Sequence, residues 1–243
     1  ADPMGQTMAP DLAESWEAAS DGMSMTFNIR KDAKWHDGTP VTAHDVEYTY
    51  YMYLNGETGS KRSGGLSMIE GSEAYTNGET DTVSGIVVLD DHTIRFDQAF
   101  PNILFLGQTN LQILPKHILG DVAPDKLANE KFFFDAPVGS GPFKFVSYVP
   151  DQRIETVAND DYYFGRPNID KMILKIIKSP DAIAIALQRG EVHIPIFDGG
   201  EQASTEQFQQ FIDDQRFDVK ASKGTTLISY AFNSRVPELN NDK

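Results

Sequence analysis

Residues 34–51 constrain the fold of this chain more than any other stretch, because a turn and a helix start follow one another closely there. Asp37 opens an Asp-Gly turn, and the Thr-Pro pair after it restarts the chain in extended geometry. Thr42 is suited to cap a helix, and Asp45 stands three residues later, where a capping box places an acid. The stretch therefore predicts a strand, a tight turn and a helix that runs to about Leu54.

Alternating apolar and polar residues predict strands on both sides of this stretch. Residues 12–29 and 83–96 are each expected to form a hairpin, and a third hairpin is expected at 143–158. Later segments predict a strand, helix and strand at 169–196 with a right-handed parallel crossover, a short helix at 206–213, an edge strand at 217–220 and a strand at 225–232. The pattern indicates a mixed α/β (α+β) fold with mixed sheets and flanking helices.

The charge of the chain excludes one large class of partner. Its formal net charge is −15 and its pI is near 4.6, and no basic stripe is visible, so we expect no nucleic-acid binding. The absence of cysteine excludes disulfides and thiolate chemistry. No apolar run reaches the length of a membrane span, so membrane association is expected only through a removed signal or a lipid anchor.

No catalytic or metal-binding pattern stands out in the sequence. The five histidines are scattered, and His36 and His44 are too far apart to share a helix face, which argues against a metal site. Ser140 lies between two glycines without the spacing of a nucleophile elbow. Those glycines instead allow the backbone to approach another group closely, and a phosphate cradle is disfavoured by the net charge. We expect no enzyme activity, no metal and no cofactor.

Seven segments along the chain resemble the family 5 extracellular solute-binding proteins, the peptide, oligopeptide and nickel-binding receptors of ABC importers. They occur in the family's order and read LAESW at 12–16, FNIR at 27–30, WHDGTPVTAHDV at 35–46, GSGPF at 139–143, NDDYY at 159–163, ALQRGEV at 186–192 and AFN at 231–233. Threonine is common in the family at the position of Ser140.

The resemblance implies a periplasmic-binding-protein type II-like fold and a receptor that closes two lobes around a solute. It implies a periplasmic or extracellular, cell-surface-anchored protein that delivers the solute to the permease subunits of an ABC transporter. A peptide is the favoured solute, with nickel complexes, sugars or opines as alternatives. A sensory or interaction module that reuses the fold without a permease is a second possible class.

The chain departs from the family pattern at both ends, which predicts an incomplete fold. A strand upstream of Leu12 and a further lobe after Asn233 are missing from the pattern. We expect residues 9–135 to form the family's second domain and residues 136–243 an incomplete first domain, with the second ligand-binding lobe absent. An exposed apolar face and weak solute binding are expected consequences.

The resemblance also suggests four ligand-binding residues. Tyr230 and Asn233 belong to the strand that precedes the missing lobe and lines the hinge side of the family's pocket. Arg62 lies in a loop that is able to reach the ligand, and Ser140 is expected to contribute backbone contacts. Packing within a strand is the alternative reading of Tyr230.

Overall fold

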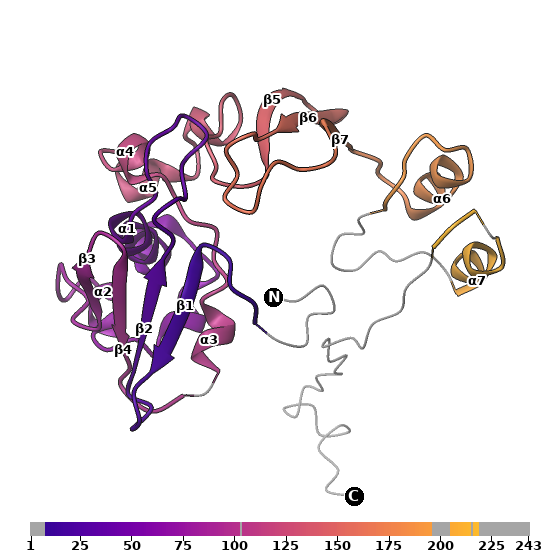
Figure 1. Cartoon of the computed structure of the whole chain (residues 1–243). Coiled ribbons are helices and arrows are strands. Elements are labelled where there is room, and N and C mark those ends of the chain that lie inside the picture. The colour runs from indigo at the N-terminus through magenta and orange to yellow at the C-terminus, as the bar shows by residue number, and fades with distance from the viewer. Residues whose placement is uncertain (1–7, 103, 196–204, 215, 219–243) are drawn as a thin grey trace, which may run out of the picture.

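The computed structural model describes residues 8–102, 104–195, 205–214 and 216–218, and it holds two antiparallel sheets followed by two helices (Figure 1). The first sheet and the helices around it come from residues 8–135. The second sheet and both later helices come from residues after 142. No helix in the described ranges combines the length and apolar character that crossing a membrane requires.

The first sheet contains four strands in the order β1-β2-β4-β3. Its strands are β1 (Ala13–Ala18), β2 (Ser24–Ile29), β3 (Ile86–Asp90) and β4 (Thr93–Asp97). Both predicted hairpins are confirmed, because β1 pairs with β2 and β3 pairs with β4. The two hairpins meet through β2 and β4, where Phe27 pairs with Ile94. Residues 30–85 form the long connection between them.

Helix α1 (Ala43–Leu54) lies within that connection, as the capping box predicts. Its apolar face packs Val46, Tyr50 and Leu54 into one core with side chains of β2 and β4. Phe96 is 1% exposed at the centre of this core, and its ring lies 4.5 Å from that of Tyr50 and 5.7 Å from that of Phe105. Burial of aromatic and branched side chains against one amphipathic helix face is the main source of stability in such a unit.

Short helices complete this part of the chain. They are η1 (Gly56–Thr58), η2 (Ser63–Leu66), α2 (Ser72–Thr76), α3 (Phe105–Gln108), α4 (Lys116–Leu119), α5 (Pro124–Leu127) and η3 (Lys131–Phe133). Pro115 is the N-cap of α4 and has extended backbone geometry. We call residues 8–135, with the first sheet and these helices, the β1–β4 unit.

The second sheet has three strands in the order β5-β6-β7. The predicted hairpin joins β5 (Phe143–Val149) to β6 (Arg153–Ala158), and β7 (Lys171–Lys175) pairs antiparallel with β6. Beyond it, α6 (Pro180–Gln188) and α7 (Thr205–Asp213) contact each other through Leu187 and Phe211.

Two strand predictions after α6 are wrong for the residues that the structure describes. Residues 192–195 are irregular, so no parallel crossover with β7 forms over them; Ile194 is 78% exposed, and Pro195 has no amide proton to donate to a ladder. Phe217 and Asp218 are likewise not in a strand, because the Phe217 ring packs on Phe211 of α7 at 4.9 Å between centroids. The strand predicted at 225–232 lies outside the described residues.

The second sheet carries exposed apolar side chains on both of its faces, since the strand register places Val157 and Ile173 on one face and Tyr148 and Met172 on the other. Several of its apolar side chains are more than a third exposed, namely Val146, Tyr148, Val157, Met172 and Ile173.

Candidate functional site

The β1–β4 unit meets the second sheet at a junction that contains one of the four predicted site residues, Ser140. We call residues 137–142, which lead into β5, the junction loop. A groove of about 350 Å³ opens beside the loop and is lined by His36, Asp37, Lys144 and neighbouring residues. The site is therefore built from the turn that follows Trp35 and from the Gly-Ser-Gly-Pro segment about a hundred residues later.

His36 holds the junction loop on both sides of Ser140. The His36 backbone N–H donates to the Gly139 carbonyl at 2.8 Å, and the Gly139 N–H donates back to Nδ1 of the ring at 3.2 Å. The other ring nitrogen, Nε2, lies 3.0 Å from the carbonyl oxygen of Gly141. Since Nδ1 accepts a hydrogen bond from the backbone, Nε2 carries the ring hydrogen and donates a hydrogen bond to Gly141, which fixes a neutral imidazole in one tautomer.

The close approach that the two glycines predict is confirmed at Gly139, and the partner is His36. A Cβ atom at position 139 would lie 3.2 Å from Cε1 of the imidazole, closer than ordinary packing allows. The Gly141 carbonyl also accepts from Nδ2 of Asn159, which is 2% exposed. The loop is thus held from the β1–β4 unit and from the end of β6 together.

Charged groups surround this contact. Nζ of Lys144 donates to the His36 carbonyl at 3.4 Å, and Asp37 bonds His117 of α4 at 2.7 Å. Partial burial is the largest influence on His36 and lowers the pKa of its ring, and the Lys144 ammonium acts in the same direction. The bond to Gly141 and the charge of Asp37 oppose this shift but do not reverse it.

A second contact crosses the junction at Tyr163. Its hydroxyl donates to Asp11 at 2.5 Å, and the guanidinium of Arg30 lies 5.0 Å from its ring centroid. Burial raises the pKa of Tyr163, and the bond to Asp11 raises it further, so the hydroxyl stays protonated as a donor. Val138 and Tyr163 also pack on a small buried cluster around Trp35.

The arrangement supports binding and positioning rather than acyl-transfer chemistry. Both ring nitrogens of His36 are engaged by backbone groups, so the imidazole does not serve as a base for the Ser140 hydroxyl. Within the described ranges, no group of three or more His, Asp or Glu side chains is arranged to hold a metal ion.

The other predicted site residues are not brought to this junction by the described structure. Arg62 is exposed and follows the C-terminal end of α1, whereas His36 precedes the start of that helix. The 12 residues of α1 separate the two ends by about 18 Å at 1.5 Å per residue. Tyr230 and Asn233 lie outside the described residues.

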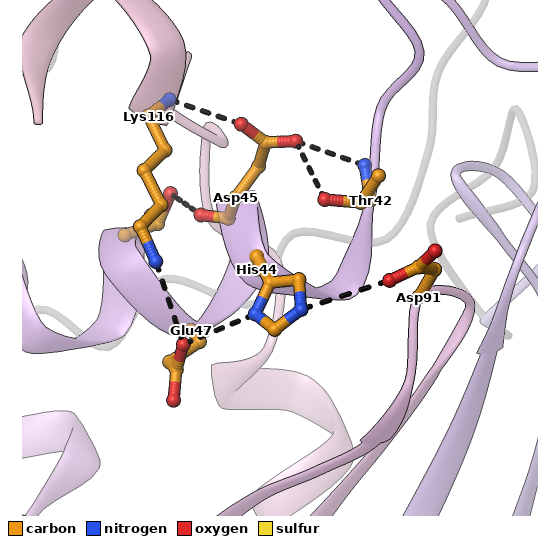
Figure 2. Close-up of polar contacts among 7 residues, drawn as sticks. Thr42, His44, Asp45, Glu47, Asp91 and Lys116 are labelled. Carbon is orange, nitrogen blue, oxygen red and sulfur yellow. Dashed lines mark hydrogen bonds and ion pairs between the residues drawn. The ribbon is translucent and has the colours of Figure 1, made fainter.

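The start of α1 holds a second polar cluster, shown in Figure 2. The carboxylate of Asp45, which is 5% exposed, accepts from the backbone N–H of Thr42 at 2.8 Å and from that of Lys116 at 2.9 Å. On the outer face His44 lies near Glu47 and Asp91, at 3.5 Å and 3.7 Å. The inner carboxylate thus joins α1 to the start of α4, while the outer contacts are long and solvated.

The two joined sheets with their flanking helices are part of a type II periplasmic binding protein fold, the fold of solute-binding receptors. The chain belongs to the bacterial extracellular solute-binding proteins, family 5, whose family model matches residues 7–243. The fold class and the family that the sequence predicts are both confirmed.

Similar proteins include peptide-binding and nickel-binding examples. A putative ABC transporter peptide-binding protein of Brucella ovis is 33% identical over 233 residues, which cover 96% of this chain and 40% of that protein. The oligopeptide-binding protein AppA of Bacillus subtilis, solved with a nonapeptide, superposes with a TM-score of 0.64 at 32% identity, covering 75% of this chain and 34% of AppA. NikZ from Campylobacter jejuni, solved with Ni(L-His), gives the same TM-score and coverage at 26% identity. The chain thus spans about 40% of the length of its curated relative.

Proposed function

We propose that this chain is part of the substrate-binding component of an ABC transporter and that its solute is a peptide. The observation that carries the proposal is the family match over residues 7–243 together with 33% identity to a peptide-binding relative. The oligopeptide-bound structure of AppA supports the same solute class at 32% identity. The proposed partners are the permease subunits of the transporter, and the proposed location is the periplasm or the cell surface.

The proposal includes a division of the chain and a set of contacts. Residues 9–135 are proposed as the family's second domain and residues 136–243 as an incomplete first domain, which is supported by strand pairing confined to each sheet. Tyr230 and Asn233 are proposed as ligand contacts on the hinge side of the pocket. Ser140 is proposed to contribute from the junction loop, and Arg62 is proposed as a more distant contact.

Two-dimensional NMR of the whole 243-residue chain tests the solute class, because chemical-shift changes detect weak binding to part of a cleft. We expect mixed peptides of two to nine residues to shift a localised set of resonances that includes Ser140, Tyr230 and Asn233. Ni(L-His) and opines are expected to leave this set unchanged. Shifts with Ni(L-His) and none with any peptide would make the peptide assignment wrong.

Variants separate the proposed contacts from the rest of the surface. Tyr230→Ala is expected to weaken peptide binding by about tenfold or more, as truncation of an aromatic contact commonly does. Glu57→Ala is the matched control, since Glu57 is exposed on η1 and has no proposed role. An equal loss of peptide affinity in both variants would argue against the contact.

Mass spectrometry of the peptide mixture after incubation is expected to find every peptide intact, since no catalysis is proposed.

A further inference from the structure

The contact of His36 with the junction loop depends on the protonation state of one ring nitrogen. Nδ1 accepts from the Gly139 N–H at 3.2 Å, and Nε2 donates to the Gly141 carbonyl at 3.0 Å. A proton added to Nδ1 would point at the Gly139 N–H, so that two donors would face each other. The neutral ring makes both bonds, whereas the imidazolium retains only the bond to Gly141.

We propose that His36 is a pH-sensitive latch: its neutral imidazole holds both the N–H of Gly139 and the carbonyl of Gly141, and its protonated ring releases the Gly139 N–H. The latch lies where the chain passes from one sheet to the other, in a protein family that works outside the cell. Acid would loosen the loop that carries Ser140 and leave both sheets folded.

The direction of the pH dependence follows from the surroundings of the ring. Partial burial lowers the pKa of His36 in the closed state, with the Lys144 ammonium on β5 acting in the same direction. We call the loop closed when Gly139 bonds the His36 ring and open when it does not. Because the pKa of His36 in the closed state lies below that of a free imidazole, the ring stabilises the closed loop fully above the ordinary histidine pKa of about 6.5. This stabilisation decreases as the pH falls below that value toward the lower pKa of the closed state.

The charged and titratable groups around the ring come from four parts of the chain. Lys144 faces His36 from β5, Asp37 follows it in the chain, and His117 of α4 bonds Asp37. Asp135 lines the same groove from the segment before the junction loop. Burial and the Lys144 ammonium lower the pKa of His36, and the Asp37 carboxylate, which favours the imidazolium, does not reverse this shift.

Other contacts across the junction do not involve the His36 ring, and the His36 backbone N–H keeps its bond to the Gly139 carbonyl. The Tyr163 hydroxyl bonds Asp11, and the Arg30 guanidinium lies over the Tyr163 ring. Val138 packs on the cluster around Trp35. These contacts persist when His36 is protonated, so the opening is local to the junction loop and is not a separation of the two sheets.

Amide hydrogen exchange at Gly139 tests the latch directly in the whole chain. Its protection factor, corrected for the intrinsic pH dependence of exchange, is expected to fall between pH 7.5 and 5.5. The fall approaches tenfold per pH unit in the interval between the open-state and closed-state pKa of His36. His36→Gln supplies one acceptor and one donor without a titratable group, and its protection factor is expected to stay constant over this range.

His117→Gln is the matched control, because it removes the histidine that bonds Asp37 next to His36 and leaves the His36 bonds in place. It is expected to keep the pH profile of the unmodified chain. A constant Gly139 protection factor in the unmodified chain, or an equal fall in His36→Gln, would overturn the proposal.

If His36→Gln does not fold, the ring nitrogens of His36 are titrated by NMR in the unmodified chain. The latch then requires an Nε2–H tautomer at pH 7.5 and a titration midpoint that coincides with the loss of Gly139 protection, and a different tautomer or midpoint would equally overturn it.

Discussion

Replacing Asp45 by alanine is expected to lower the free energy of unfolding of the β1–β4 unit by about 3 kcal/mol, since hydrogen bonds to a charged group are worth about 1.5–3 kcal/mol each and their loss leaves buried donors unpaired. The carboxylate accepts from the backbone N–H groups of Thr42 and Lys116 and from the Thr42 hydroxyl. Urea unfolding followed by circular dichroism measures the change.

Asp45→Asn keeps the shape of the side chain and removes its charge, so it tests how much the charge of the carboxylate contributes to stability. One amide oxygen is unable to serve both backbone donors, and the amide N–H₂ would face one of them, so a loss of about 2 kcal/mol is expected. Glu47→Ala, two residues further along α1, is the control. Its ion pair with Lys116 is 3.8 Å long and solvated, so a change of less than about 1 kcal/mol is expected. Equal losses for Asp45→Ala and Glu47→Ala would contradict the role of the buried carboxylate.

Asp45 also shows how far local sequence reasoning extends. Its place three residues after Thr42 predicts the capping box and the start of α1, because both partners lie within one helical turn. The bond to Lys116 joins residues 71 positions apart, and no local spacing predicts it. The sequence therefore predicts the helix but not what the helix end holds in place.

The same limit applies at the candidate site. The two glycines around Ser140 predict a close approach of the backbone, and the structure supplies the partner, His36, which lies 103 positions away from Gly139. A histidine that bonds backbone groups leaves no sequence pattern of its own, so the sequence did not indicate this role of His36. Its place beside Trp35, whose side chain is buried, is the one available sign of a structural role.

Strand errors arose where pairing partners decide the outcome. Residues 192–195 have the β-branched composition of a strand, but strand propensity depends on a neighbouring strand and on burial. β7 pairs only with β6 among the described strands, and Ile194 stays exposed. The hairpins were predicted correctly because each strand finds its partner across a short turn.

Residues 35–46, which carry the most recognisable family motif, thus serve two structural purposes. His36 at one end holds the junction loop, and Asp45 at the other end holds the start of α4. The turn between them includes Asp37, which bonds His117 of the same short helix. The motif is a scaffold that connects three parts of the chain.

Replacing Gly85 by alanine is expected to destabilise the β1–β4 unit by on the order of 3 kcal/mol, at the upper end of the usual cost of overpacking a filled site. Gly85 lies between two backbone segments: its N–H donates to the Glu70 carbonyl at 2.9 Å, and its own carbonyl accepts from Asp97 at 2.8 Å. A Cβ atom there would lie 2.5 Å from the Asp97 carbonyl oxygen and 2.7 Å from the Glu70 nitrogen. Backbone atoms do not rotate away as side chains do. The alanine methyl group must therefore push β4 away from the backbone of Glu70 and weaken the bonds of Gly85 with Glu70 and Asp97.

Gly107→Ala is the matched control for this substitution. A Cβ atom at Gly107 meets nothing within 4 Å, and the residue lies in α3, where alanine is favoured over glycine by up to about 1 kcal/mol. Urea unfolding is therefore expected to show an unchanged or slightly higher midpoint for Gly107→Ala and a clearly lower one for Gly85→Ala. Amide exchange adds a local test, because the Asp97 N–H bonds Gly85 directly and is expected to lose protection only in Gly85→Ala. Full protection of Asp97 in that variant would mean that the two backbone segments tolerate the methyl group, and the proposed close packing around Gly85 would be wrong.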